Sequence, residues 1–233
     1  MSEQNMNEQI ALEIVDKIFL NVFGQKNNLS LDEVMEKFAF DVPLPQKVQD
    51  GSGATTWTLM NFGTKFITQE EQVKKDSWML PKREISGVDE LVEIWRQTNL
   101  ITTERVFDSV NVIKSDCIYG CENVFHSSNS NGCKNIVFCD GCHGSTHILA
   151  CQRSGNMENC IRVDDSANCS NSYNIICSGK ISNSLVIQDC NSLHECIFCS
   201  HISDKRYCIA NMQFEKEEYF ALKKKIIDWI LKN

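Results

Sequence analysis

Short apolar runs recur along residues 105–213 and are separated by stretches rich in Gly, Asn, Ser and Asp. The runs of one set start 24, 25, 24 and 23 residues apart: Val112-Ile113, Ile136-Val137-Phe138, Ile161-Arg162-Val163, Leu185-Val186-Ile187 and Cys208-Ile209-Ala210. A second set lies between them, with starts 24, 27 and 22 residues apart: Val124-Phe125, Ile148-Leu149, Ile175-Ile176 and Ile197-Phe198. Such short runs, rich in Ile and Val and bounded by turn-forming residues, predict strands rather than helices.

The period predicts a solenoid, in which each coil buries its apolar face against the next coil. We expect each coil to span one such period and to contain three short strands joined by turns of variable length. In this respect residues 105–213 resemble the right-handed parallel β-helix proteins. The predicted fold class is therefore mainly β, with a right-handed parallel β-helix of about five coils. That architecture hosts lyases, hydrolases, phage tailspikes and binding proteins, so the resemblance implies no particular activity.

The end of the repeat region carries a narrower resemblance. The sequence KRYCIAN at residues 205–211, followed by FEKEEY at residues 214–219, is similar to the closing segment of cysteine-rich repeat proteins of bacterial and phage type. No function is attached to that group, so this likeness implies the fold alone.

The segments outside the repeat predict helices and a few strands. We expect an α/β head or cap over residues 1–104, on four local signals. These are an apolar helix face over residues 10–23, a capping box from Ser30 to Glu33, a hairpin turn at residues 50–53 and a strand at Phe66-Ile67. A further helix should open at Ser86 with four apolar residues inward: Leu91, Val92, Ile94 and Trp95. Residues 214–233 predict a helix with an acidic first turn and a basic end, which caps the last coil.

Composition limits the class of partner. The formal net charge of −8 and a pI near 5.2 argue against a dedicated nucleic-acid binder, which would show a basic stripe. No apolar stretch is long enough to span a membrane, and residues 1–5 lack the features of a secretion signal. We therefore expect a cytoplasmic protein that contacts neither nucleic acid nor a membrane.

All 13 cysteines lie between Cys117 and Cys208. An odd number of thiols in a reducing compartment argues against a disulfide framework, and free cysteine packs as a small apolar residue. We therefore expect the thiols to stack in the solenoid core.

Two cysteine motifs suggest cofactor chemistry. Residues 139–143 match the C-x-x-C-H pattern of haem attachment, but that chemistry requires export and a haem pocket. His194, Cys196, Cys199 and His201 resemble a zinc half-site, yet neighbouring positions on a strand point to opposite faces. Neither motif has a βαβ context that would indicate a thioredoxin-like pair. We therefore expect no metal and no cofactor, and keep a metal- or redox-responsive protein as an alternative.

An acidic column is the candidate binding ridge. Asp116, Asp140, Asp165 and Asp189 each follow the start of a first-set run by four residues, with Asp164 beside Asp165. In a β-helix this spacing would stack four carboxylates about 4.8 Å apart. Such a column either begins turns through bonds to its own backbone or forms a cation-binding or catalytic ridge of a carbohydrate-active enzyme. No Lys or Arg recurs at the same phase, which disfavours a lyase.

The head supplies two candidate contacts. Trp57 and Trp78 fall in predicted loops or strand edges, where aromatic side chains either anchor a partner or pack in a core. Since no convergent catalytic set is evident, the sequence favours a non-catalytic protein-binding or scaffold protein over an enzyme. An acidic inhibitor of a basic macromolecule, as among phage anti-defence proteins, is one form of this hypothesis.

Overall fold

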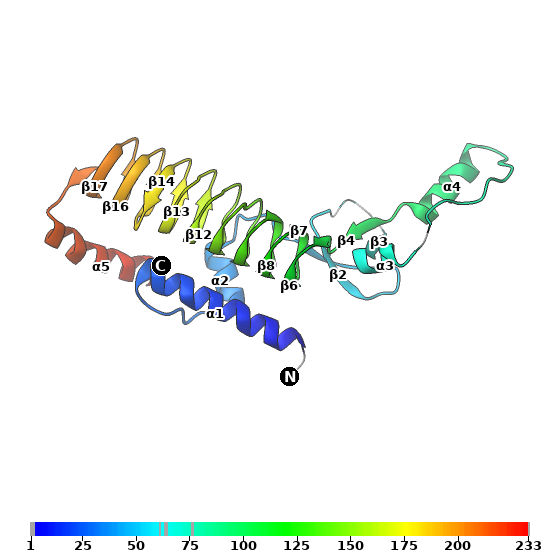
Figure 1. Cartoon of the computed structure of the whole chain (residues 1–233), viewed down its shortest axis with the longest axis horizontal. Coiled ribbons are helices and arrows are strands. Elements are labelled where there is room, and N and C mark those ends of the chain that lie inside the picture. The colour runs from blue at the N-terminus through cyan, green and yellow to red at the C-terminus, as the bar shows by residue number, and fades with distance from the viewer. Residues whose placement is uncertain (1–2, 61, 63–64, 76, 233) are drawn as a thin grey trace.

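The computed structural model describes residues 3–60, 62, 65–75 and 77–232, and a β-solenoid of about nine turns dominates it (Figure 1). Its strands pair in parallel, and each residue lies beside the residue twelve positions further along the chain. One column of partners runs through Glu122, Lys134, Thr146, Glu158 and Ser170. The predicted solenoid of parallel strands is confirmed.

The predicted length of the coil is wrong. Val112, Val124, Ile136 and Ile148, which belong alternately to the two sets of apolar runs, are successive partners in one column. The period within either set of apolar runs therefore spans two turns, and the chain makes about nine turns rather than five. The direction of winding stays a prediction.

The solenoid strands are β5 (Val106–Phe107), β6 (Val110–Ile113), β7 (Asp116–Tyr119), β8 (Glu122–Phe125), β9 (Ser128–Asn131), β10 (Lys134–Val137), β11 (Thr146–Leu149), β12 (Glu158–Asp164), β13 (Ser170–Ile176), β14 (Gly179–Ser182), β15 (Leu185–Gln188), β16 (Asn191–Ser200) and β17 (Ser203–Ile209). A short strand, β18 (Met212–Gln213), pairs antiparallel with β17 and ends the parallel stack.

A left-handed backbone conformation at every third residue shapes each turn. From Asp108 to Ala210, each third residue has a positive φ, so a twelve-residue turn has four corners. Asparagine and glycine adopt this conformation more readily than other residues. Ten asparagines and four glycines occupy these corners, which explains the abundance of Asn along the repeat.

The residue after each corner points into the solenoid. Ile136, Cys139, Cys142 and Ser145 hold consecutive inward positions, and all four are buried. Eleven of the 13 cysteines are buried and fall at such positions: Cys121, Cys133, Cys139, Cys142, Cys151, Cys160, Cys169, Cys190, Cys196, Cys199 and Cys208. Core packing therefore accounts for these thiols, whereas Cys117 and Cys177 lie at corners.

Inward serine and cysteine side chains complete the backbone hydrogen bonding at the corners. Ser184 Oγ donates to the carbonyl of Ser182 at 2.8 Å and accepts the Cys196 N–H of the next turn at 3.0 Å. Cys151 makes the same pair of contacts, because its thiol donates to the Leu149 carbonyl and Sγ accepts the Val163 N–H. Buried backbone groups without partners are costly, so a small side chain that both donates and accepts is favoured here.

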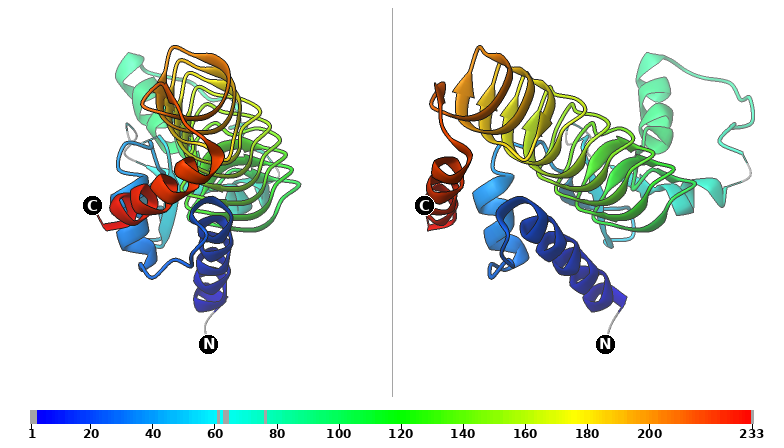
Figure 2. Two further views of the ribbon diagram at one scale, coloured as in Figure 1. Left: turned by 90° about the vertical axis from the view of Figure 1, so that its left-hand side faces the viewer. Right: turned by 60° about the vertical axis from the view of Figure 1, so that its left-hand side comes forward.

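One outer face of the solenoid is apolar, and helices cover it. Phe125, Val137, Leu149 and Ile161 are successive outward residues that pack in one cluster with α1 (Glu3–Phe23), α2 (Leu31–Phe38) and α5 (Lys216–Lys232). Helix α1 lies lengthwise along this face, and α5 runs back beside the stack from its C-terminal end (Figure 2). Among the described residues, every helix is too short or too polar to span a bilayer.

A compact head over residues 1–104 is not confirmed, because α1 and α2 flank the solenoid instead. The N-terminal end carries two small sheets, formed by β1 (Gln46–Gln49) with β2 (Thr55–Thr58) and by β3 (Phe66–Thr68) with β4 (Ile101–Thr103). Two helices, α3 (Gln69–Val73) and α4 (Val88–Thr98), lie between β3 and β4 in the chain. The predicted capping box of α2 and the hairpin β1–β2 are both present.

Replacing Ser184 tests the role of inward hydroxyl groups. We expect Ser184→Ala to lower the free energy of unfolding by about 1–3 kcal/mol, because it leaves the buried N–H of Cys196 without its partner. Ser184→Cys keeps a donor and an acceptor and should cost less, as Cys196 fills the next position of the same column. Urea unfolding followed by circular dichroism measures both values, and equal costs would contradict the explanation.

Candidate functional site

The structure separates the acidic residues that were expected to stack. Asp116 lies beside Ser128, Ser128 beside Asp140, Asp140 beside Gln152, and Gln152 beside Asp164. Each carboxylate is thus two turns from the next, or about 10 Å at ordinary strand spacing. Asp165 and Asp189 occupy corners in the adjoining column. The expected ridge of carboxylates on adjacent turns does not form.

Asp116 is buried and ties the N-terminal segment to the solenoid. Its carboxylate forms a two-pronged ion pair with Arg105, at 2.9 Å from Nε and 2.7 Å from Nη2, and accepts the Arg105 N–H at 3.0 Å. It also accepts the hydroxyl of Thr58 and the N–H of Leu59, which end the β1–β2 hairpin. Burial alone would raise the pKa of Asp116, but the hydrogen bonds and positive charge of Arg105, together with the N–H of Leu59, outweigh burial and hold the pKa below its ordinary value.

The other acidic residues are at least partly exposed and have local partners. Arg153, one turn before Asp165, contacts Asp164 at 2.6 Å and Asp165 at 3.0 Å. Arg153 was not evident from the sequence, because the apolar runs of one set recur only every second turn. Arg153 lies one turn before Asp165 and therefore falls midway between two such runs. Asp140 accepts bonds from Ser128 and Asn129 of the previous turn. Asp189 is 3.9 Å from an exposed imidazole, that of His201.

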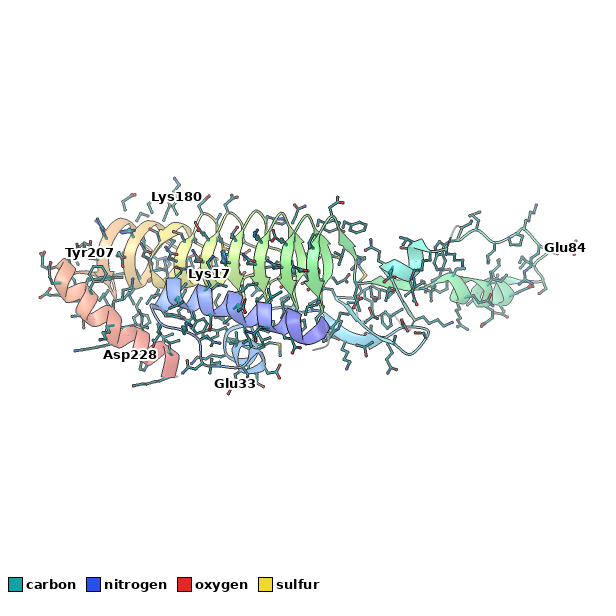
Figure 3. All side chains as sticks on the ribbon, turned by 60° about the horizontal axis from the view of Figure 1, so that its bottom comes forward. Lys17, Glu33, Glu84, Lys180, Tyr207 and Asp228 are labelled. Carbon is teal, nitrogen blue, oxygen red and sulfur yellow. The ribbon has the colours of Figure 1, made fainter. Side chains whose placement is uncertain are left out.

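A shallow hollow of about 890 Å³, lined by Asp165 and Arg153 among others, extends over five turns. Its floor has little side-chain relief because Gly141, Gly155 and Gly179 line it. Lys180, which also lines this hollow, projects from the solenoid in Figure 3. Among the described residues that line the hollow, Asp165 is the one carboxylate, and it is paired with Arg153, so the lining does not supply two acids for general acid and base chemistry.

The cysteine motifs place thiols and imidazoles on different sides of the wall. Cys139 and Cys142 point inward, whereas His143 is exposed. Cys196 and Cys199 are also inward, since a corner at Phe198 separates them, while His194 bonds Ser182 on the outside and His201 is exposed. Burial raises the pKa of the Cys169 thiol to about 11, which keeps it protonated at neutral pH. No group of three or more metal-ligating side chains with suitable geometry occurs within the described part of the chain.

Trp57 and Trp78, the two tryptophans expected as contacts, lie near the N-terminal end of the solenoid. Trp57 is half-buried on β2 and packs edge-on against His126, with ring centroids 5.0 Å apart. Trp78 is half-buried, and the Lys75 ammonium group lies 3.9 Å from its ring centroid.

Residues 77–99 form a protruding segment, here called the arm, which contains Trp78 and α4. The helix α4 extends away from the solenoid beyond the two small sheets (Figure 1), and Glu84 marks the far end of the arm (Figure 3). None of its side chains is buried. The expectation that Leu91, Val92, Ile94 and Trp95 point into a core is wrong, because the first, second and fourth are exposed and Ile94 is only half-buried.

A groove of about 820 Å³ opens between the N-terminal segment and the solenoid. Strand β6 and the residues that follow it form one wall, and α3 with β2 forms the other. Glu104 lies in the groove, where burial raises the pKa of its carboxyl group despite hydrogen bonds to Thr56 and Trp57. The groove could not be predicted from the sequence, because its walls come from segments that are remote in the chain.

Comparison with known proteins identifies no relative: no family model, curated protein or solved structure matches this chain. The geometry of the described residues therefore carries the functional argument alone.

Replacing Asp116 tests its structural role. We expect Asp116→Asn to lower the free energy of unfolding by about 2–4 kcal/mol, because Arg105 then loses a buried anionic partner. Since the folded-state pKa of Asp116 is depressed, its contribution is present above about pH 4 and is lost as the pH falls toward that lower pKa. The variant should lack this acid-dependent component in urea unfolding at several pH values. Asp140→Asn, in the same column but partly exposed, serves as the control and should cost under about 1 kcal/mol; similar costs for both variants would refute the assignment.

Proposed function

We propose that this protein is a non-catalytic binding protein, in which the solenoid is a rigid support that presents the arm to a partner protein. The observation that carries this proposal is the exposed apolar face of α4. The spacing of Val88, Leu91 and Trp95 places them on one side of the helix. Their side chains are 73%, 50% and 57% exposed. An amphipathic helix of this kind is usually stabilised by packing that covers its apolar face.

The solenoid supports this function by its rigidity. Its turns are joined by columns of backbone and side-chain hydrogen bonds, and three helices brace its outer face. When the arm binds a partner, the solenoid from which it extends does not need to move. A preorganised surface loses less conformational entropy when it binds a partner.

The charge of the chain favours a partner with a basic surface around an apolar groove. The chain carries a formal charge of −8, and α4 contributes Asp89, Glu90 and Glu93 against one arginine. An amphipathic helix that inserts its apolar face into a groove is a common mode of recognition. Occupation of a basic macromolecular surface by an acidic inhibitor in the cytoplasm is the form of this function that we favour.

A differential capture experiment tests the arm. Wild-type protein, the double variant Leu91→Asp with Trp95→Ala, and the control Met212→Asp are immobilised and exposed to nuclease-treated lysate of the native host. Met212 is 57% exposed, like Trp95, but lies at the opposite end of the solenoid. We expect one stoichiometric protein on the wild type and the control, and a loss in affinity of at least about tenfold for the double variant.

Calorimetry with the purified partner measures the three affinities, and the affinity of the wild type should fall as ionic strength rises. Absence of any partner on the wild type, or equal affinity of the double variant, would refute the proposal. Because α4 has no buried residue and Met212 is exposed, all three proteins should give the same unfolding curve.

A further inference from the structure

The first complete turn of the solenoid has an unpaired edge. Strand β6 is the last strand of its sheet and pairs only with β8 among the described residues. In the turns that follow, the equivalent residues donate backwards: His126 N–H to Ile113 at 3.0 Å, and Phe138 N–H to Phe125 at 3.1 Å. The N–H of Lys114 heads the same column, and it has no such acceptor in the described structure because β4 pairs with β3 instead.

The core is also incompletely covered at this edge. Val112 is half-buried, whereas its partners in the next two turns, Val124 and Ile136, are 1% and 0% exposed. The groove of about 820 Å³ lies directly against Val112 and contains the inward side chains Ser109 and Ser115. One further strand in the groove would therefore bury apolar surface and satisfy free backbone groups at the same time.

The opposite wall supplies negative charge. Glu104 and Glu70 line the groove, and Glu70 is paired with Lys74, an exposed lysine outside it. The carboxylate of Glu104 has hydroxyl and backbone partners but no cation among the described residues. The groove's own lysine, Lys114, is engaged by Glu8 at 2.9 Å. A cationic side chain entering the groove would thus find an uncompensated carboxylate.

We propose that this groove binds an extended peptide segment of another protein, which adds to the free edge of β6 as a parallel or antiparallel strand and places a lysine or arginine against Glu104. Strand addition supplies affinity through main-chain hydrogen bonds, while pockets for alternate side chains supply specificity. The peptide would place β-branched residues over Val112 and its basic residue toward Glu104. This surface is separate from the apolar face of α4, so the inference goes beyond the arm contact.

The test uses the full chain and a phage-displayed library of short random peptides. Peptides are selected on the wild type and deselected on Glu104→Lys. We expect enrichment of extended sequences with alternating Val, Ile or Thr and one Lys or Arg. Changing that basic residue to Gln should weaken binding by about tenfold on the wild type and have little effect on Glu104→Gln, as a double-mutant cycle measures.

Amide hydrogen exchange distinguishes strand addition from a side-chain contact. The Lys114 amide should exchange quickly in the free protein and become protected in the complex, whereas the Phe138 amide should be protected in both states. The arm variant Leu91→Asp with Trp95→Ala should bind the peptide like the wild type, so the two proposals fail independently. Absence of enriched peptides, or binding that leaves Lys114 unprotected, would overturn the inference.

Discussion

The solenoid depends on satisfying the backbone at a corner that recurs every third residue. A left-handed residue at each corner turns the chain, and the residue after it must then fill the core and meet the polar groups of the corner. Serine and cysteine can do both, because they are small and can donate to the carbonyl two residues earlier while accepting the next turn's N–H. Larger apolar residues such as Ile136 then fill the space that the small residues leave.

This constraint explains the unusual use of cysteine without assigning it chemistry. The inward positions of one turn are Cys133, Ile136, Cys139 and Cys142, and equivalent positions elsewhere hold serine. Cysteine and serine thus occupy equivalent inward positions in successive turns, as Ser130, Cys142 and Ser154 do. Motifs such as C-x-x-C-H arise here because a three-residue spacing separates adjacent inward positions, while the following histidine faces solvent.

The strands, their parallel stacking and the terminal helices could be predicted from the sequence, but the length of the turn could not be predicted from apolar runs. A run such as Ile136-Val137-Phe138 mixes an inward residue, an outward residue and a corner. The start of a run moves when an inward position is polar, as where Ser172 takes the place of Ile148 two turns earlier. The apparent drift in the period of the runs therefore reflects substitutions at fixed positions rather than turns of variable length. The three-residue spacing of Cys, Ser and Ile was the signal that would have revealed the turn.

The two candidate surfaces, the edge of β6 and the apolar face of α4, lie at the N-terminal end, where the repeat of stacked turns ends. Within the stack each turn is covered by its neighbours, so outward residues such as Asp140 and Asp164 are spaced by geometry and do not converge. At the N-terminal end β4, which directly precedes the stack in the chain, pairs with β3 instead of with the solenoid. Strand β6 is therefore without a second strand partner among the described residues, and α4 is without a core. The C-terminal end differs, because β18 folds back on β17 and α5 continues along the side. The two ends therefore differ: the C-terminal edge is covered, whereas the edge of β6 is not, and both proposed contact surfaces lie at that N-terminal end.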